Sequence, residues 1–187
     1  MAERQGNGPA GAQDLERIRA GILDVPDHPR PGVVFKDVTP LLADPVGFDA
    51  AIACLSAPFR DAGPGIDLVA AVEARGFLLG APLALALGVG LVPVRKKGKL
   101  PRRTVSAEYS LEYGTAQIEI HEDAVRPGQR ILLVDDVLAT GGTAAAACGL
   151  LEDLGGIVAA VAVLAELSCL NGRKLLAGRR IEALTAL

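Results

Sequence analysis

Four stretches of this chain are almost wholly apolar, and each has the length of a single β-strand. They cover residues 66–72, 90–94, 130–134 and 157–164, and the patterns at residues 76–87 and 143–154 between them are helical. An apolar run without polar alternation indicates a strand buried on both faces. Such strands alternating with helices are typical of a parallel sheet covered by helices. We therefore predict an α/β fold with a central, mostly parallel sheet, built as a single domain over residues 14–187.

The regions around this alternating core are less regular. Residues 1–13 are small and polar, and we expect a disordered tail there. Helical patterns cover residues 14–23 and 45–61, and the stretch 25–45 that joins them holds five prolines. Polar and apolar residues alternate over 116–120, which predicts an exposed or edge strand.

Charge and composition exclude several classes of function. The net charge of -3 and an aromatic content of 3% argue against a basic protein that stacks several nucleic-acid bases. The three cysteines are far apart, which disfavours a zinc site or disulfide framework and suits a reducing compartment. Residues 1–13 lack the apolar stretch of a secretory signal. We expect a cytoplasmic protein with no nucleic-acid partner.

Residues 76–94 carry no charge and are nearly long enough to span a bilayer. Two prolines and several glycines interrupt the run, and charged residues flank it closely. We interpret the run as a short buried helix followed by a buried strand, and we expect no membrane association.

The most informative segment joins the strand at 130–134 to the helix at 143–154. Asp135 and Asp136 end the strand, and a turn with two adjacent glycines follows. Backbone N–H groups at such a helix start bind phosphate, and ligands of open α/β sheets lie at the carboxyl ends of strands. Two carboxylates there suit a ligand that also donates hydroxyls or brings a divalent cation, as a phosphorylated sugar does. A capped helix after a buried strand would explain the turn but not the acidic pair.

Three further segments have the composition of ligand-binding loops. Arg75 follows the strand at 66–72 and starts a helix, where an anionic ligand would suit its charge. Residues 95–103 hold six of the 19 basic residues, which suits a solvated face, a nucleic-acid contact or a charged active-site lid. Phe35 lies in the proline-rich stretch, either as a core anchor or as a ligand contact.

The segment from Val134 to Thr143 resembles the signature for phosphoribosyl pyrophosphate (PRPP) in type I phosphoribosyltransferases. This resemblance implies that Asp135 and Asp136 bind the ribose hydroxyls. The residues it implies for the 5-phosphate are Ala139, Thr140, Gly141, Gly142 and Thr143. The segment Val-Glu-Ala-Arg-Gly-Phe resembles the pyrophosphate loop of the same family, with Arg75 as its anion-binding residue. The resemblance also predicts a cis or strained peptide at Glu73–Ala74.

The basic segment and the Ser-Leu-Glu-Tyr-Gly that follows it resemble the flexible loop of adenine phosphoribosyltransferases, at about residues 95–114. By that resemblance, Lys99 binds pyrophosphate and Glu112 is the acid near N7 of the base. Lys96 and Tyr113 belong to the same loop, and Tyr113 closes over the substrates.

The proline-rich stretch resembles the loop that reads the base in these enzymes. The resemblance implies that Phe35 packs on the purine and that the backbone of Val34 bonds its edge. A backbone N–H and C=O together match adenine, whereas a 6-oxopurine reverses the pattern. Lys36 stands where many relatives have arginine, which puts a bidentate contact there in doubt.

Taken together, the resemblance implies a type I phosphoribosyltransferase fold with a small hood, formed by about residues 24–45 and the C-terminal region. It implies a purine-salvage enzyme that converts adenine and PRPP to AMP and pyrophosphate. Mg²⁺ would be carried by PRPP with no direct protein ligand, and the enzyme would be a homodimer. Two alternatives stay open: a phosphoribosyltransferase for 6-oxopurines, and a regulator that uses the site to sense PRPP. Residues 1–24 are too short for a helix-turn-helix domain, which disfavours the regulator.

Overall fold

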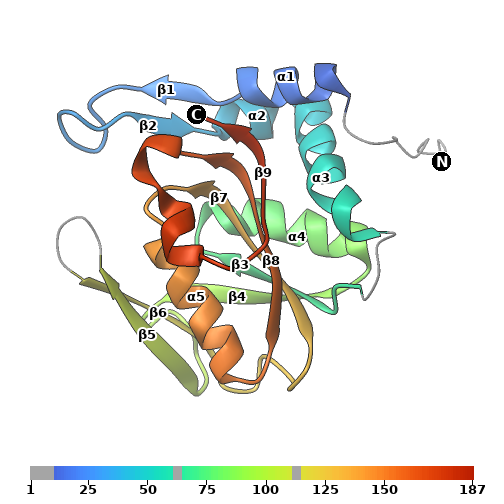
Figure 1. The fold of residues 1–187 in the computed structure, drawn as a ribbon, viewed down its shortest axis with the longest axis vertical. Coiled ribbons are helices and arrows are strands. Elements are labelled where there is room, and N and C mark those ends of the chain that lie inside the picture. Colours follow the sequence, from blue (N-terminus) through green and yellow to red (C-terminus); the bar gives the residue numbers. More distant parts are fainter. Residues whose placement is uncertain (1–10, 61–64, 111–114) are drawn as a thin grey trace.

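A mixed sheet of seven strands, in the order β5-β6-β4-β3-β7-β8-β9, forms the centre of the computed structural model (Figure 1). The model describes residues 11–60, 65–110 and 115–187. The parallel strands are β3 (Leu68–Val72), β4 (Gly90–Lys96), β7 (Arg130–Leu138), β8 (Ile157–Glu166) and β9 (Ile181–Ala186). The antiparallel strands are β5 (Thr104–Ser110) and β6 (Thr115–His121). The predicted α/β class is confirmed.

Helices cover both faces of this sheet. The helices α1 (Ala12–Ala20), α3 (Pro45–Arg60) and α4 (Arg75–Leu87) pack on one face, and α5 (Gly142–Asp153) packs on the other. The remaining short helices are α2 (Thr39–Ala43), η1 (Ser168–Leu170) and η2 (Gly172–Leu176). Two-sided cover explains why the central strands are apolar at every position rather than at every second one.

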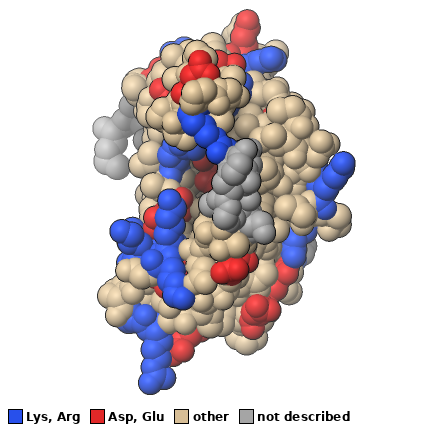
Figure 2. Space-filling view, turned by 90° about the vertical axis from the view of Figure 1, so that its left-hand side faces the viewer, with Lys and Arg blue, Asp and Glu red and all other residues tan. Residues whose placement is uncertain are grey.

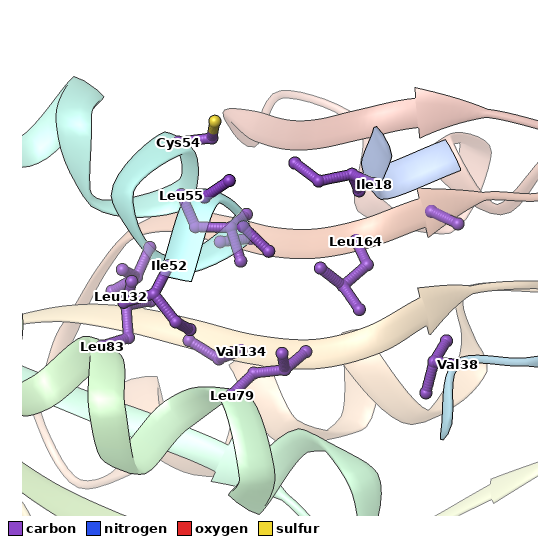
Figure 3. Packing of buried hydrophobic residues seen from close by; sticks show 14 of the residues in the cluster. Ile18, Val38, Ile52, Cys54, Leu55, Leu79, Leu83, Leu132, Val134 and Leu164 are labelled. Atoms are coloured by element: carbon purple, nitrogen blue, oxygen red, sulfur yellow. The ribbon is translucent and has the colours of Figure 1, made fainter. Parts of the chain in front are cut away.

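Side chains of β7 alternate between the two cores. Leu132 and Val134 lie between Ile52 of α3 and the leucines Leu79 and Leu83 of α4 (Figure 3). Their neighbours along the strand point to the opposite face and pack against α5. Complete burial of each leucine stabilises the fold by about 1.5–3 kcal/mol. The sheet is therefore fixed from both sides at the strand that carries the acidic pair.

The prediction of an edge strand at 116–120 is wrong. Strand β6 lies between β4 and β5, and the true edge is β5, within the segment expected to be a loop. Glu119 is buried although its alternating neighbours suggested an exposed face. Glu119 is covered because the turn before β5 folds back on it, so that its carboxylate accepts the N–H groups of Lys99 and Leu100.

The boundaries of the first helix also differ from expectation. Helix α1 begins at Ala12, two residues before the predicted start, because the Asp14 carboxylate accepts the Gly11 N–H at 3.2 Å. It ends at Ala20, since Gly21 closes its last turn and Leu23 begins strand β1. Residues 1–10 of the expected tail lie outside the described residues.

A two-stranded hairpin stands beside the main sheet (Figure 1). It pairs β1 (Leu23–Val25) with β2 (Phe35–Asp37), and Figure 1 shows the C-terminal end of β9 next to it. The loop between its strands is held by the Asp27 carboxylate, which accepts the Gly32 N–H at 2.8 Å. The family resemblance implied a hood from about residues 24–45 and the C-terminal region, and this hairpin lies largely within the first of these segments.

The uncharged run at residues 76–94 forms a helix and a strand, as expected. Helix α4 ends at Leu87, where Gly88 adopts a left-handed conformation with φ of 70°, and β4 follows. Within the part of the chain that is described, no helix has both the length and the apolar character needed to cross a membrane.

We predict that Gly80→Ala in α4 destabilises the protein. A Cβ at Gly80 would lie 2.5 Å from the Ala71 Cβ of β3, and neither atom belongs to a flexible side chain. The gain in helix propensity is about 1 kcal/mol, whereas overpacking a core costs about 1–3 kcal/mol. Urea unfolding should show a net loss of unfolding free energy.

Gly149→Ala in α5 is the matched control. A Cβ there meets nothing within 4 Å, so the same change should stabilise the protein. Equal stability of the Gly80 variant and the wild type would contradict this account of the packing.

Candidate active site

A cavity of about 900 Å³ opens at the carboxyl ends of β3 and β7. The hairpin, the loop after β3, the end of β7 and the C-terminal segment line it. Figure 2 shows this side of the molecule, with a hollow beneath the upper lobe, acidic atoms inside it and Lys and Arg side chains gathered nearby. An acidic floor with basic surroundings suits a ligand that has both hydroxyl and anionic groups.

The acidic pair forms the floor of this cavity. The sequence suggested that Asp135 and Asp136 end the strand. Strand β7 instead continues to Leu138, so both residues lie inside it. Asp136 is buried and forms an ion pair with Arg75. The Asp135 carboxylate accepts the backbone N–H of Asp136 at 2.9 Å. Burial, together with the charge of Asp136, raises the pKa of Asp135 well above its ordinary value.

Arg75 connects the floor of the cavity to its upper wall. Its Nε donates to Asp136, and its guanidinium carbon lies 4.7 Å from the centroid of the Phe35 ring. The ring of His28 approaches Phe35 edge-on at 5.0 Å. Phe35 is therefore a cavity residue rather than a core anchor. Three segments far apart in the sequence meet here, as the loop motifs predicted.

The backbone before Arg75 adopts the predicted conformation, with a cis peptide bond between Glu73 and Ala74. The Glu73 carboxylate accepts the Arg95 Nε–H at 2.9 Å, and the Glu73 N–H donates to the Val94 carbonyl at 2.9 Å. These contacts fix the loop to the neighbouring strand β4 and orient Arg75 toward the cavity.

The glycine-rich loop packs against the C-terminal segment at very short range. A Cβ at Gly141 would lie 2.4 Å from the Gly172 carbonyl oxygen, and Gly141 has φ of 85°. A Cβ at Gly172 would in turn lie 2.3 Å from the Ala139 carbonyl oxygen. Only glycine satisfies both conditions, so Gly172 supports the loop. Sequence reasoning did not identify Gly172, because a single glycine between two short helical turns carries no distinctive pattern.

The other predicted residues of this loop lie around the start of α5. Ala139 and Thr143 are on the cavity wall. Thr140 is exposed, Gly141 is buried and Gly142 is the first residue of the helix. The first N–H groups of α5 have no acceptor within the helix, as at every helix start. The arrangement can hold an anion at this end of the helix.

The predicted lid residues are only partly placed in the cavity. Lys96 lines the wall, whereas Lys99 is exposed and, among the described residues, is not part of that wall. Glu112 and Tyr113 lie outside the described residues. Tyr109, which precedes them on β5, lines the cavity.

On the hairpin side of the cavity, Val34 and Lys36 lie with Phe35 on the wall. The Lys36 Nζ forms an ion pair with the Asp24 carboxylate across the hairpin at 2.6 Å, so its charge is already partnered. The C-terminal segment adds side chains that sequence reasoning did not single out, namely Leu167, Cys169, Leu170 and Leu187. Apolar residues without a motif gave no signal that could have identified them.

Comparison with known proteins identifies the family of this chain. Residues 37–175 match the model of the phosphoribosyl transferase domain. An adenine phosphoribosyltransferase from Nocardioides sp. is 58% identical over 167 residues, which are 88% of this chain and 90% of that protein. The crystal structure of adenine phosphoribosyltransferase from Thermoanaerobacter pseudethanolicus is 54% identical, with a TM-score of 0.88 over 92% of this chain and 99% of that one. The chain belongs to the adenine phosphoribosyltransferases.

A more distant adenine phosphoribosyltransferase, from Saccharomyces cerevisiae, is 38% identical with a TM-score of 0.86, over 92% of this chain and 99% of that one. Its crystal structure contains adenine and an imino-altritol bisphosphate. These relatives confirm the predicted type I fold. The present chain is accordingly a pentosyltransferase of purine salvage. The comparisons do not favour the 6-oxopurine enzyme or the regulator.

We predict that Asp135→Asn stabilises the folded protein while lowering its activity. The folded-state pKa of Asp135 is above the unfolded value, so the cost of its charge is complete above the folded pKa and declines to zero as the pH falls from the folded to the unfolded pKa. The asparagine oxygen can still accept the Asp136 N–H. The gain in unfolding free energy should be on the order of 1 kcal/mol at pH 7.5 and smaller at pH 5. Urea unfolding at both pH values measures it, and a loss of stability at pH 7.5 would contradict the prediction.

Proposed function

We propose that this chain transfers the phosphoribosyl group of PRPP to adenine through the cavity residues described above. The observation that carries the proposal is the meeting of Asp136, Arg75 and Phe35 in one cavity. A carboxylate, a guanidinium and an aromatic ring provide contacts for ribose hydroxyls, pyrophosphate oxygens and a purine face, respectively.

Asp135 and Asp136 accept the ribose hydroxyls, and residues 139–143 bind the 5-phosphate at the start of α5. Arg75 uses Nε toward Asp136, which leaves its two Nη groups to donate to pyrophosphate. The ion pair thus orients the guanidinium before the substrate arrives. Lys99 supplies a second cation to the pyrophosphate, for which its long, exposed side chain must extend from the turn toward the cavity.

Phe35 packs on one face of adenine, and the backbone of Val34 bonds the edge of the base. Both residues lie on the cavity wall. Buried backbone groups left unpaired by the wrong base cost about 1–3 kcal/mol each, which favours adenine over 6-oxopurines.

The reaction breaks the bond between C1 of the ribose and the pyrophosphate oxygen, and the electron pair leaves with pyrophosphate. Adenine N9 then bonds to the electron-poor C1, and the N9 proton passes to solvent water. Arg75 and Lys99 neutralise the charge that develops on the leaving group. Glu112 acts as the acid near N7, and Lys96 and Tyr113 belong to the loop that covers the substrates. The cavity contributes chiefly by holding both partners in position.

The oxygen chemistry of the cavity fits Mg²⁺. Carboxylates of Glu73, Asp135 and Asp136 line it, and their negative charge favours a cation that the substrate brings. In the proposal Mg²⁺ is held by the diphosphate of PRPP, with these carboxylates nearby and no direct protein ligand. Mg²⁺ supplies charge neutralisation at the leaving group when bound.

The proposal includes a homodimer in the cytoplasm. Leu78 and Leu85 project from the same outer face of α4 and are 51% and 83% exposed, so a second copy would gain by covering them. Cys54, Cys148 and Cys169 are free thiols, which suits a reducing compartment.

The purified protein with PRPP and Mg²⁺ should consume adenine and produce AMP and pyrophosphate in equal amounts. Chromatography of the bases before and after incubation measures this directly. Adenine, hypoxanthine, guanine and xanthine supplied together provide the control for specificity. Preferred loss of a 6-oxopurine would contradict the assignment of the base.

Phe35→Leu should raise the KM for adenine about tenfold, because base–aromatic stacking contributes about 1–3 kcal/mol. The KM for PRPP should change less than about twofold, because the ion pair with Asp136 still orients Arg75 when its contact with the Phe35 ring is lost. Phe35→Tyr keeps the ring and serves as the matched control, with kinetics near wild type. Steady-state rates with each substrate varied in turn test this. An equal rise in both KM values would place Phe35 outside the base subsite.

A further inference from the structure

Glu119 is a buried carboxylate that the mechanism above does not use. It lies in β6 and is 4% exposed, and its neighbour Ile118 lines the cavity. Its Oε1 accepts the backbone N–H groups of Lys99 and Leu100, each at 3.0 Å, and its Oε2 accepts the Thr104 hydroxyl at 3.2 Å. Two of these donors belong to the turn between β4 and β5, which carries Lys99.

Burial alone would raise the pKa of Glu119, but the hydrogen bonds that it accepts outweigh burial. The donors are the N–H groups of Leu100, Gly98 and Lys99 and the Thr104 hydroxyl, and together they hold the pKa below its ordinary value. The side chain is therefore ionised, and charge-assisted bonds of this kind are stronger than neutral ones. The turn is attached to β6 by an acceptor that is itself fixed within the sheet.

The same turn is connected to the pyrophosphate loop. Arg95 is the cross-strand neighbour of Glu119, and its Nη1 donates to the Lys99 carbonyl at 3.1 Å. The Arg95 Nε donates to the Glu73 carboxylate at 2.9 Å, two residues before Arg75. Hydrogen bonds therefore run without interruption from Glu119 through Lys99 and Arg95 to the loop that carries Arg75.

We propose that Glu119 is a positioning residue for the diphosphate of PRPP. It fixes the turn that carries Lys99 and, through Arg95, the loop that carries Arg75, so that the backbone segments bearing the two cations hold a constant separation. A residue that only stabilised the sheet would have no reason to direct one oxygen at two backbone donors of this turn. The inference rests on the proposed function, because it concerns the substrate assigned there.

The test compares Glu119→Met with Glu119→Gln. Methionine matches the length of the side chain but accepts no strong hydrogen bond, whereas glutamine keeps an acceptor oxygen at the same place. Gln117→Met is the matched control, since Gln117 is also on β6, two residues away, and its side chain bonds Glu108 rather than the turn. Calorimetry measures the Kd for PRPP with Mg²⁺, and hydrogen exchange measures the amides of Lys99 and Leu100. Thermal unfolding reports whether each variant is folded.

Glu119→Met should weaken PRPP binding about tenfold and speed exchange at both amides, consistent with the loss of two charge-assisted hydrogen bonds. Its KM for adenine should stay within about twofold of wild type, because the base subsite lies elsewhere. Gln117→Met should match the wild type in both measurements, and Glu119→Gln should lie between the wild type and Glu119→Met, because its neutral oxygen accepts weaker hydrogen bonds. If Glu119→Met does not fold, Glu119→Asp withdraws the oxygens by one methylene group and should show the same losses.

Normal PRPP affinity and slow amide exchange in the methionine or aspartate variant would overturn the inference. Equal impairment of the glutamine variant would also overturn it, since the acceptor would then not be what matters. Failure of the wild type to consume adenine would instead count against the proposed function. The two failures are distinguishable because PRPP binding and amide exchange are measured without adenine.

Discussion

Burial of β3 and β7 on both faces is the constraint on which the rest of the structure depends. Helices cover each face of these strands, so polar side chains are excluded along most of their length. Polar groups can begin only where the strands pass the edge of the helical layers. In β7 this point falls at Asp135, and in the segment after β3 it falls at Glu73. The location of the site therefore follows from the packing of the sheet.

The acidic pair is costly to hold at this edge. Asp135 and Asp136 are adjacent, Asp136 is buried, and the shared environment raises the pKa of Asp135. An ion pair with Arg75 offsets part of the repulsion at Asp136. A well-packed fold gains nothing from two neighbouring carboxylates here, so their presence is best explained by the ligand that we propose they bind. The fold is less stable at this point because the proposed function requires charged side chains there.

The sequence predicted the parts of the fold that depend on continuous burial. The apolar runs became β3, β4, β7 and β8, and the motifs placed Asp135, Arg75 and Phe35 in one cavity. It failed where partners come from distant parts of the chain. The alternation of β6 predicted an edge strand because nothing local shows that β5 covers it.

The residues of the cavity wall likewise divide into those that the sequence could identify and those that it could not. Residues with a chemical signature, such as Lys96 and Thr143, could be named from their motifs. Leu167, Leu170 and Leu187 could not, because an apolar side chain is equally suited to a core and to a cavity wall. Gly172 is a further case, because only the folded chain brings the Ala139 carbonyl next to it. A Cβ at Gly172 would lie 2.3 Å from that oxygen.

Arg75 joins the two halves of the site into one unit. Its Nε is committed to Asp136 on the sugar side, and its guanidinium plane contacts the ring of Phe35 on the base side. Both the ion pair and the cation–π contact strengthen as water is excluded. A change in the position of Arg75 is therefore felt by the residues assigned to ribose and by the residue assigned to adenine. Because both contacts belong to one side chain, Arg75 couples the residues that we assign to ribose with the residue that we assign to adenine.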